Sequence, residues 1–388
     1  MACGGLKTGF ERSLRKYGKA DNQVGMSEKE AWVALNLIPG LGPVKVRRLL
    51  ERFGSARQIL SAGEEDLRGV AGVGGDLART IRDWRRHVDV EGEIKLAGEL
   101  GARIISMADG EYPEILKQIH DPPVVLYLWG GFEGRDRHAV GVVGTRNPSV
   151  YGSEMANKLA YQLAYAGVTV VSGLARGVDT AAHLGALAAG GRTIAVVGSG
   201  LAQLYPPENA ELAERIRGSG VVVSEFPLRT SADRQTFPMR NRIVSGLSVG
   251  LLVVEAGVRS GALITAGMAA EQGRSVFALP GRVDSPRSAG CNRLIQQGAK
   301  LVTCAQDVLD EFGLLFREVP ELRGREMPEG LSEVERKVFE AVGDGEPTVD
   351  EVVGRSGLPT NEVASTLLSL ELRKLIRSLP GGRMVRTG

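Results

Sequence analysis

Arginine is the residue type whose number and placement could do chemistry in this chain. Seven arginines follow apolar runs or glycine-containing turns in its central part: Arg146, Arg176, Arg229, Arg234, Arg240, Arg242 and Arg259. A guanidinium group fits two phosphate oxygens at once, and neighbouring Gly, Ser and Thr residues let backbone amides join the contact. Phe237 lies three residues beyond Arg234, so a base could stack on its ring. The pattern indicates a site for single-stranded nucleic acid rather than for a lone mononucleotide.

A structural role for the same residues stays open at this point. Phe237 could belong to the core, and some arginines could form ion pairs with Glu225, Asp233 or Glu255. If all the arginines were paired internally, the chain would be a structural or interaction scaffold.

Asp179 and His183 have the spacing of an acid/base pair on one helix face. Such a pair more commonly caps and stabilises its own helix, with the aspartate near the N-terminus. The sequence offers no nucleophile elbow, no Walker lysine and no carboxylate cluster for a metal. We therefore predict no catalytic residues.

The stretch at residues 139–152 positions the first of these arginines. The apolar run AVGVVG has the length of a strand, Thr145 and Arg146 form the turn, and a helical pattern covers residues 153–166. In an open α/β sheet, the loop after a strand faces the ligand crevice, and the next helix offers unpaired N–H groups there. We therefore expect an anionic ligand at this turn.

Further apolar runs predict strands that alternate with helices. The predicted strands of the alternating region are 139–144, 168–172, 193–198, 220–224, 249–254 and 275–279. Two further strands, 103–106 and 124–129, precede this region. The predicted helices include 262–272 and 305–316. Strands that are apolar on both faces and separated by helices form a parallel sheet covered on both sides. The sequence thus predicts a Rossmann-like, doubly wound α/β fold. Loops at 172–179, 198–201, 225–237 and 255–261 should join the turn at Arg146 in one crevice.

The composition limits the class of protein. At 388 residues the chain is too long for one compact core, and its 48 basic residues are nearly balanced by 46 acidic ones, so a nucleic-acid site must be a local patch. Cys3, Cys291 and Cys304 lack metal-site spacing, which favours a reducing compartment and no metal or cofactor. No run reaches the roughly 20 apolar residues of a membrane span. We expect a cytoplasmic protein with a disordered leader at residues 1–26.

Residues 27–100 predict a helical domain with two similar turns. The turns read IPGLGP from Ile38 and VAGVGG from Val70. They resemble helix–hairpin–helix units, whose exposed N–H groups can contact a DNA phosphate at a helix N-terminus. The alternative is that glycine only closes tight connections in a small bundle, although Lys45, Arg47 and Arg48 favour DNA slightly.

The C-terminal residues 331–388 show the pattern of a winged helix, and a charged linker at 317–330 separates them from the sheet domain at 101–316. Three helical patterns at 332–342, 349–356 and 360–374 precede a hairpin with strands 375–379 and 383–386. Eight basic residues stand against nine acidic ones there, and the third helix offers apolar and acidic groups where a DNA reader needs Arg, Asn or Gln. A protein contact, or a basic wing on a DNA backbone, fits this composition better than duplex readout.

Seven motifs occur in one order along the chain. They are VGTR with Ser149 and YG within 143–152, SGLARGVDTAAH at 172–183, TIAVVGSGL with YPPEN within 193–209, SEFP at 224–227, FPMRNRIVSGLS at 237–248, VVEAGVRSGALITA at 253–266 and LPG at 279–281. This succession closely resembles the DNA-processing protein A family, also called Smf, over about residues 109–304.

The resemblance implies a non-enzymatic, single-stranded DNA-binding protein that dimerises through its Rossmann-like domain, protects incoming DNA and loads the RecA recombinase during natural transformation. In that family the Gly-Ser/Thr-Arg loop and the basic residues around the RNR stretch hold DNA phosphates. Carried over by position and joined with the neighbouring loop residues, the predicted site is Gly144, Thr145, Arg146, Ser149, Ser172, Gly173, Arg176, Gly177, Arg234, Phe237, Arg240, Asn241, Arg242, Ser260 and Gly261. Ala202 and Ala262 depart from residues common in the family, which weakens a claim for a small polar ligand at their loops but leaves the arginines unaffected.

A competing resemblance is to the LOG-type nucleotide phosphoribohydrolases, which have a similar sheet. Their pattern is P-G-G-x-G-T-x-x-E, whereas the corresponding run here is AGVRSGALITA. The catalytic glutamate would fall at an apolar or small residue, so this chain would lack the acid that such a hydrolase needs.

Overall fold

The computed structural model describes residues 26–313, 328, 330–343, 345, 347–373, 375–379 and 382–386. Its contacts divide the chain into two units, with the boundary between Val319 and Pro320. Residues 1–25 of the predicted leader and most of the predicted linker at 317–330 lie outside the described residues. Every helix within the described ranges is too short or too polar to cross a bilayer.

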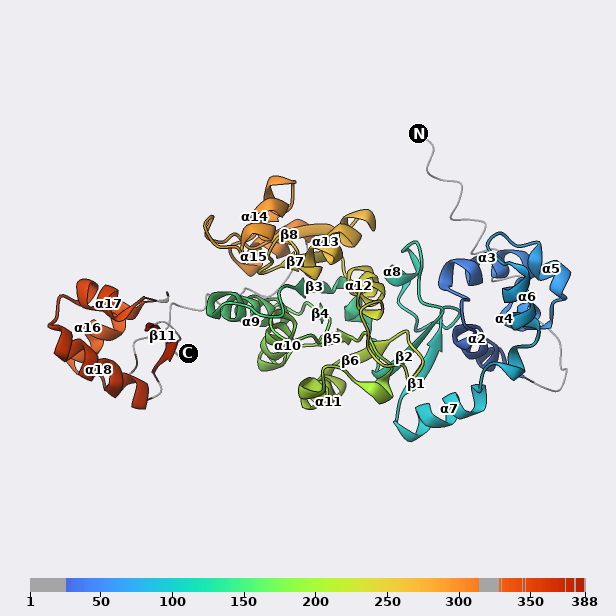
Figure 1. Ribbon diagram of the computed structural model, residues 1–388, viewed down its shortest axis with the longest axis horizontal. Helices are drawn as coiled ribbons and strands as arrows, with labels where there is room; N and C mark the ends of the chain where they lie inside the picture. Colours follow the sequence, from blue (N-terminus) through green and yellow to red (C-terminus); the bar gives the residue numbers. More distant parts are fainter. Residues whose placement is uncertain are drawn as a thin grey trace. The chain divides into compact units, whose positions relative to one another are not determined.

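A nine-stranded sheet forms the centre of the first unit, in the order β1-β2-β6-β5-β4-β3-β7-β8-β9 (Figure 1). The strands are β1 (Arg103–Ser106), β2 (Val125–Gly130), β3 (Val140–Val143), β4 (Val170–Ser172), β5 (Thr193–Val196), β6 (Val221–Ser224), β7 (Gly250–Val253), β8 (Ser275–Ala278) and β9 (Lys300–Leu301). All neighbours from β6 to β9 in that order are parallel. Only the β1–β2 and β2–β6 pairs in this sheet are antiparallel. The predicted mainly parallel sheet is confirmed, and each predicted strand overlaps an observed one.

The chain reverses its progress across the sheet at β3. From β3 it moves outward through β4, β5 and β6, and it then returns to β7 on the other side of β3. Loops leaving the carboxyl ends of β3 and β7 therefore diverge to opposite sides. Ligands bind in the crevice that opens at such a switch point.

Helices cover both faces of the sheet (Figure 1). One face packs on α9 (Val150–Tyr165), α10 (Val178–Ala188) and α15 (Ala305–Leu309). The other core contains residues of α11 (Ala210–Ser219), α12 (Thr236–Gly246), α13 (Gly261–Glu271) and α14 (Ala289–Gln296). Within β3, Val140 and Val142 join the first core and Val143 joins the second, as the alternation of side chains along a strand requires. The predicted doubly wound arrangement is confirmed.

Several short helices complete this unit. They are α8 (Glu114–Lys117), η2 (Gly134–His138), η3 (Leu201–Gln203), η4 (Pro207–Asn209) and η5 (Asp310–Phe312). The helix predicted over 305–316 is shorter than expected, because α15 ends at Leu309 and the tighter turn η5 follows it.

A set of N-terminal helices packs beside β1 and β2 and shares a continuous core with the sheet. These helices are α2 (Glu28–Leu37), α3 (Pro43–Phe53), α4 (Ala56–Ser61), α5 (Glu64–Arg68), α6 (Gly75–Arg82), η1 (Trp84–Arg86) and α7 (Val90–Glu99). The two predicted helix–hairpin–helix turns are present, joining α2 to α3 and α5 to α6. Gly40 and Gly72 in these turns have φ of +76° and +86°, a backbone region that favours glycine.

The basic residues of the first hairpin bond to protein carbonyls. Lys45 Nζ donates to the Gly40 carbonyl at 2.9 Å, and Arg48 Nη1 donates to the Ala71 carbonyl at 3.0 Å. Arg47 Nη1 donates to a carbonyl beyond the helical set, at His120. These contacts give the three side chains a packing role, while DNA contact by the hairpins stays a prediction.

The second unit has the predicted winged-helix order. Its elements are α16 (Glu333–Val342), α17 (Val349–Ser356), α18 (Thr360–Leu372), β10 (Ile376–Leu379) and β11 (Arg383–Arg386). The guanidinium of Arg386, in the wing, lies 4.2 Å from the Phe339 ring centre and donates to the Phe339 carbonyl. Leu368 and Leu372 are exposed on α18, which keeps a protein contact on this helix as a prediction.

Candidate nucleic-acid interface

A crevice of about 670 Å³ opens at the carboxyl ends of β3 and β7, where the switch point predicts it. Ten of the fifteen predicted site residues line it: Gly144, Thr145, Arg146, Gly173, Arg234, Phe237, Arg240, Asn241, Ser260 and Gly261. Segments far apart in the sequence thus meet in one place. The remaining predicted residues are Ser149, Ser172, Arg176, Gly177 and Arg242, and each lies outside the lining of this crevice.

The lining of the crevice is strongly basic. Its arginines are Arg146, Arg234, Arg240, Arg259 and Arg287, and Asp179 is the one carboxylate among the lining residues. Four of these arginines are exposed; only Arg240 is buried. Within residues 26–313, the guanidinium groups of Arg234, Arg259 and Arg287 have no hydrogen-bond or ion-pair partner. Such groups are available to phosphate oxygens.

The Gly-Thr-Arg turn after β3 is held by backbone contacts on both sides. The Thr145 N–H donates to the Glu255 carbonyl at 2.7 Å, and the Val178 N–H donates to the Thr145 carbonyl at 3.2 Å. A Cβ on Gly144 would lie 2.6 Å from a methyl carbon of Val178, so only glycine fits beneath the turn. The turn is therefore rigid, and Arg146 extends from it into the crevice.

The N-terminus of α9 differs from the expectation that it offers unpaired N–H groups. Ser149 caps the helix by accepting the Gly152 N–H at 3.0 Å, and its own N–H and hydroxyl donate to the Glu255 carboxylate at 3.1 and 2.8 Å. A Cβ on Gly152 would overlap that carboxylate. Glu255 is buried, so an internal anion already occupies the position where we expected a phosphate.

The RNR stretch lies on a helix, which the sequence analysis had not assigned to residues 236–246. Asp233 Oδ1 accepts the N–H groups of Gln235 and Thr236 at 2.7 Å and so fixes the start of α12. Asp233 therefore holds the turn that leads into α12 and forms no ion pair with an arginine within the described residues. Spacings of three, four and seven residues share one helix face. Four of the five α12 residues that line the crevice have this spacing, namely Phe237, Arg240, Asn241 and Val244, and Pro238 lies next to Phe237 in the first turn.

Arg240 forms the floor of the crevice. It is only 4% exposed, and its Nη1 donates to the carbonyls of Gly173 and Val196. A Cβ on Gly173 would lie 2.6 Å from the guanidinium carbon, which explains why glycine occupies that position. Burial, together with the nearby Arg146 cation, lowers the pKa of Arg240 to about 10 despite the opposing charge of Asp179. Arg240 therefore stays cationic at neutral pH, and its Nη2 has no protein acceptor within the described residues.

Arg242 faces away from the crevice, because it lies two residues from Arg240 on the same helix. Its Nη2 donates to Glu225 at 2.6 Å and its Nε donates to Asp121 at 2.8 Å. Burial raises the pKa of Glu225, and the Arg242 cation opposes this shift. The alternative that some arginines pair structurally thus applies to Arg242, with Glu225 as the expected partner.

Three other predicted residues support the crevice from outside its lining. The Ser172 hydroxyl is buried and donates to the Val142 carbonyl at 2.6 Å. Gly177 has φ of +79°, and a Cβ there would lie 2.5 Å from the Thr145 carbonyl oxygen. Arg176 is exposed beside the crevice and pairs with Glu208. Two of the three therefore shape the loops, and Arg176 is positioned at the rim.

Asp179 and His183 do not contact each other. Asp179 Oδ2 accepts the N–H groups of Gly173 and Ala175 at 3.2 and 3.3 Å. The His183 Nδ1 lies 2.7 Å from the Thr193 hydroxyl, and burial lowers the pKa of this histidine to about 3. The two side chains therefore stabilise a loop and the core separately, and neither caps α10, which differs from both readings of their spacing.

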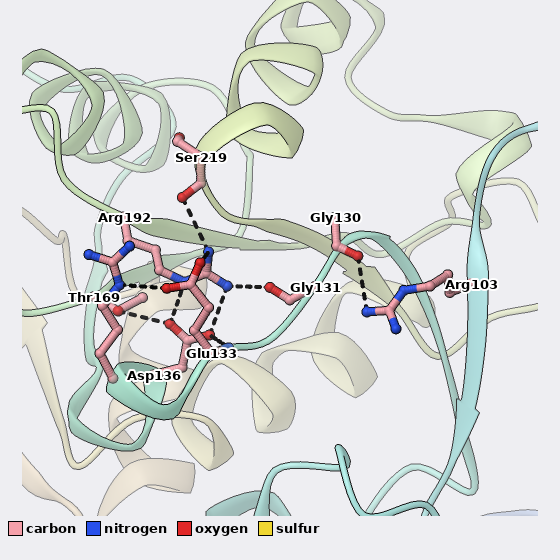
Figure 2. Close-up of polar contacts among 9 residues, drawn as sticks. Arg103, Gly130, Gly131, Glu133, Asp136, Thr169, Arg192 and Ser219 are labelled. Atoms are coloured by element: carbon pink, nitrogen blue, oxygen red, sulfur yellow. Dashed lines mark hydrogen bonds and ion pairs between the residues drawn. The ribbon is translucent and has the colours of Figure 1, made fainter.

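A second arginine cluster lies at the amino ends of the strands, where Arg192 precedes β5. Its Nε and Nη2 donate to the two carboxylate oxygens of Asp136 at 2.7 and 2.9 Å, and its Nη1 donates to Glu133 at 3.0 Å. It also donates to the carbonyls of Gly131 and Ser219. Figure 2 shows these acceptors surrounding the guanidinium. Arg192 is therefore a structural arginine at the end of the sheet opposite to the crevice.

Two side chains beside the crevice, Arg287 and Tyr205, are absent from the site predicted from the sequence. Arg287 belongs to the loop after β8, and it could have been found because all loops after parallel strands meet at one edge. Tyr205 lies in a small recess that opens beside Arg146 and Phe237. The YPPEN motif named Tyr205 without giving it a role.

Comparisons with known proteins give a match for each of the three parts of the chain. The family model described as DNA recombination-mediator protein A matches residues 103–313, a DprA winged helix domain matches 325–382, and a SAM-like helix-hairpin-helix tandem matches 34–83. Protein Smf from Synechocystis is 34% identical over 93% of this chain and 99% of its own length. DNA processing protein A from Streptococcus pneumoniae has a similar structure, with a TM-score of 0.65 and 36% identity over 74% of this chain and 98% of that one. The corresponding protein from Helicobacter pylori, whose structure is described as showing a unique single-stranded DNA binding mode, has a TM-score of 0.50 and 28% identity over 56% of this chain and 97% of that one.

Proposed function

Because the chain belongs to the DNA recombination-mediator protein A family, we propose that it binds single-stranded DNA in the crevice and acts as a recombination mediator rather than as an enzyme. The observation that carries this proposal is the lining of the crevice, in which five arginines accompany a single carboxylate. The single-stranded DNA binding of the Helicobacter pylori relative supports the same ligand.

The strand would be held mainly by its phosphates. Arg146, Arg234, Arg259 and Arg287 are exposed at the walls, and Arg240 lies at the floor with Nη2 free of protein acceptors in the described residues. Guanidinium–phosphate contacts are charge-assisted and do not depend on base identity. The binding should therefore tolerate any sequence and weaken as salt rises.

The finer parts of the proposal come from the family. We propose that the protein forms a homodimer through its Rossmann-like domain, protects incoming DNA, loads RecA during natural transformation and works in the cytoplasm. The edge strand β9 leaves Leu301 45% exposed, which supports a contact between two copies at this edge. Two crevices in a dimer would bring two strands, or two segments of one strand, close together.

The side chains of the crevice give less support to nucleotide hydrolysis. Asp179 is the one carboxylate in the lining, and its Oδ2 is engaged by backbone N–H groups of the loop after β4. A general acid or base must reach a proton of the substrate. Asp179 instead positions the loop that contacts the floor of the crevice.

The test is a fluorescence-anisotropy titration of a labelled oligonucleotide, single-stranded and duplex, with the wild type and Arg146→Ala at several salt concentrations. We expect the wild type to prefer the single strand. Arg146→Ala should weaken binding about tenfold and reduce the salt slope by about 0.7, the contribution of one phosphate contact to a single strand.

Arg215→Ala is the matched control, because Arg215 is exposed on α11 and lies outside the lining of the crevice. It should leave the affinity and the slope unchanged. Equal binding by the wild type and Arg146→Ala, or equal loss in Arg146→Ala and Arg215→Ala, would show that the crevice is not the site.

A further inference from the structure

The recess beside the crevice holds an exposed aromatic side chain, that of Tyr205. It has a volume of about 20 Å³ and is lined by residues that include Arg146, Arg176, Tyr205, Pro206 and Phe237. Tyr205 is 39% exposed, and it follows η3 in the segment between β5 and α11. Sites for single-stranded nucleic acid combine aromatic rings, on which bases stack, with basic groups that contact the phosphates, and Tyr205 with its two neighbouring arginines has this combination.

Phe237 is less able to stack a base than the sequence suggests. The guanidinium of Arg146 lies over its ring at 4.6 Å from the ring centre, and the Tyr205 ring lies beside it at 5.8 Å with a tilt of 58°. A Cβ on Gly198 would lie 3.0 Å from a ring carbon of Phe237, so the backbone also packs closely on this ring. Phe237 is thus a support for Arg146 and Tyr205, and the surface left for a base lies on Tyr205.

The charges around Tyr205 fit one nucleotide with its two phosphates. Arg146 lies on the Phe237 side of the recess, and Arg176 is held beside it by Glu208, three residues beyond Tyr205. The Arg176 side chain is still 56% exposed in this ion pair. A base on the Tyr205 ring would therefore have a guanidinium near the phosphate on either side.

We propose that Tyr205 stacks one unpaired nucleobase and thereby makes the crevice selective for single-stranded DNA, an inference that rests on the proposed function. Arginines contact the phosphates of single strands and duplexes alike, so they supply affinity without choosing between them. A base in a duplex is covered on both faces by its neighbours, whereas an unpaired base can turn a face to an aromatic ring. Strand selectivity accordingly comes from Tyr205, whereas the arginines supply the part of the affinity that single strands and duplexes share.

The experiment compares two strands of equal length, oligothymidylate and an abasic phosphodiester strand, in anisotropy titrations with the full chain. The wild type should bind oligothymidylate more tightly. Tyr205→Ala should lose on the order of tenfold in affinity for oligothymidylate and nothing for the abasic strand. Tyr205→Phe, which keeps the ring, should behave as the wild type, and Tyr205→Leu, which keeps bulk without an aromatic face, should behave as Tyr205→Ala.

Tyr165→Ala is the matched control. Tyr165 is 40% exposed, stacks on Tyr161 and lies at the end of α9 remote from the Gly-Thr-Arg turn. It should bind both strands as the wild type does. Equal losses on the two strands, or an unchanged affinity of Tyr205→Ala for oligothymidylate, would overturn the stacking role while single-stranded DNA binding by the wild type stood. Binding of neither strand by the wild type would overturn the proposed function itself.

Discussion

Arginines gather at both ends of the central sheet, and the two sets differ in their surroundings. At the amino ends, the side chain of Arg192 is 5% exposed and donates to two carboxylates and two carbonyls (Figure 2). At the carboxyl ends, exposed arginines such as Arg234 and Arg287 have no protein partner within residues 26–313. A buried, paired guanidinium contributes to folding, whereas an exposed and unpaired one is available to a ligand. The role of an arginine here thus depends on its partners.

The largest effect is expected at the amino ends. Arg192→Ala would leave Asp136, which is 8% exposed, without its cation, and breaking a buried ion pair from one side costs about 3–5 kcal/mol of unfolding free energy. Urea denaturation measures this loss. Arg103→Ala is the control from the same region, since the Arg103–Glu111 pair is half exposed and should contribute below about 1 kcal/mol. Similar losses of unfolding free energy in the two variants would show that the buried pairing of Arg192 stabilises the fold no more than an exposed ion pair does.

Two arginines of one motif should differ in the same way. Arg242 shares the RNR stretch with Arg240 but is paired like Arg192, so Arg242→Ala should cost about 2–4 kcal/mol of stability and leave the salt slope of DNA binding unchanged. Burial raises the pKa of Glu225, and loss of the Arg242 cation should raise it further. A carboxyl group with a raised pKa in the folded state loses stabilising effect as pH rises through that pKa.

The stability gap between Arg242→Ala and the wild type should therefore widen as pH rises above the raised pKa of Glu225 in the wild type, where the wild-type carboxyl ionises and that of the variant is still protonated. Denaturation curves at several pH values, each paired with an anisotropy titration, test both parts. A gap that is constant with pH would mean that Glu225 does not remain buried without its partner. A reduced salt slope would place Arg242 among the DNA contacts after all.

The smallest effect on stability is expected at the carboxyl ends. Arg287→Ala should change the unfolding free energy by less than about 0.5 kcal/mol, because this exposed side chain has no protein partner in the described part of the chain. It should weaken single-strand binding roughly threefold to tenfold and lower the salt slope by about 0.7. Titrations at three salt concentrations measure both quantities. A destabilised variant with normal DNA binding would show that Arg287 stabilises the fold and does not contact DNA.

Much of the fold follows from local sequence patterns. The apolar runs predicted the parallel strands because residues of such strands are buried on both faces. One helix and one strand pairing were not predicted, for identifiable reasons. The loop predicted over 225–237 merges into α12, because Asp233 fixes the turn before a helix that contains Pro238 in its first turn. The strands β1 and β2 were predicted as strands that precede the parallel sheet. No local sequence pattern shows that they extend this sheet with an antiparallel edge.

Local sequence patterns predicted the position and the residue types of the candidate site, namely glycine, threonine and arginine at the carboxyl ends of the strands. Which of these residues line the crevice depends on contacts between segments that are distant in the sequence. Glu255 fills the N-terminus of α9 from a strand end 106 residues away, and α12 turns Arg240 into the crevice while it turns Arg242 toward Glu225. The physical reason is that residue type sets the charge of a group, whereas burial and partners, which come from distant segments, decide whether that charge is already satisfied.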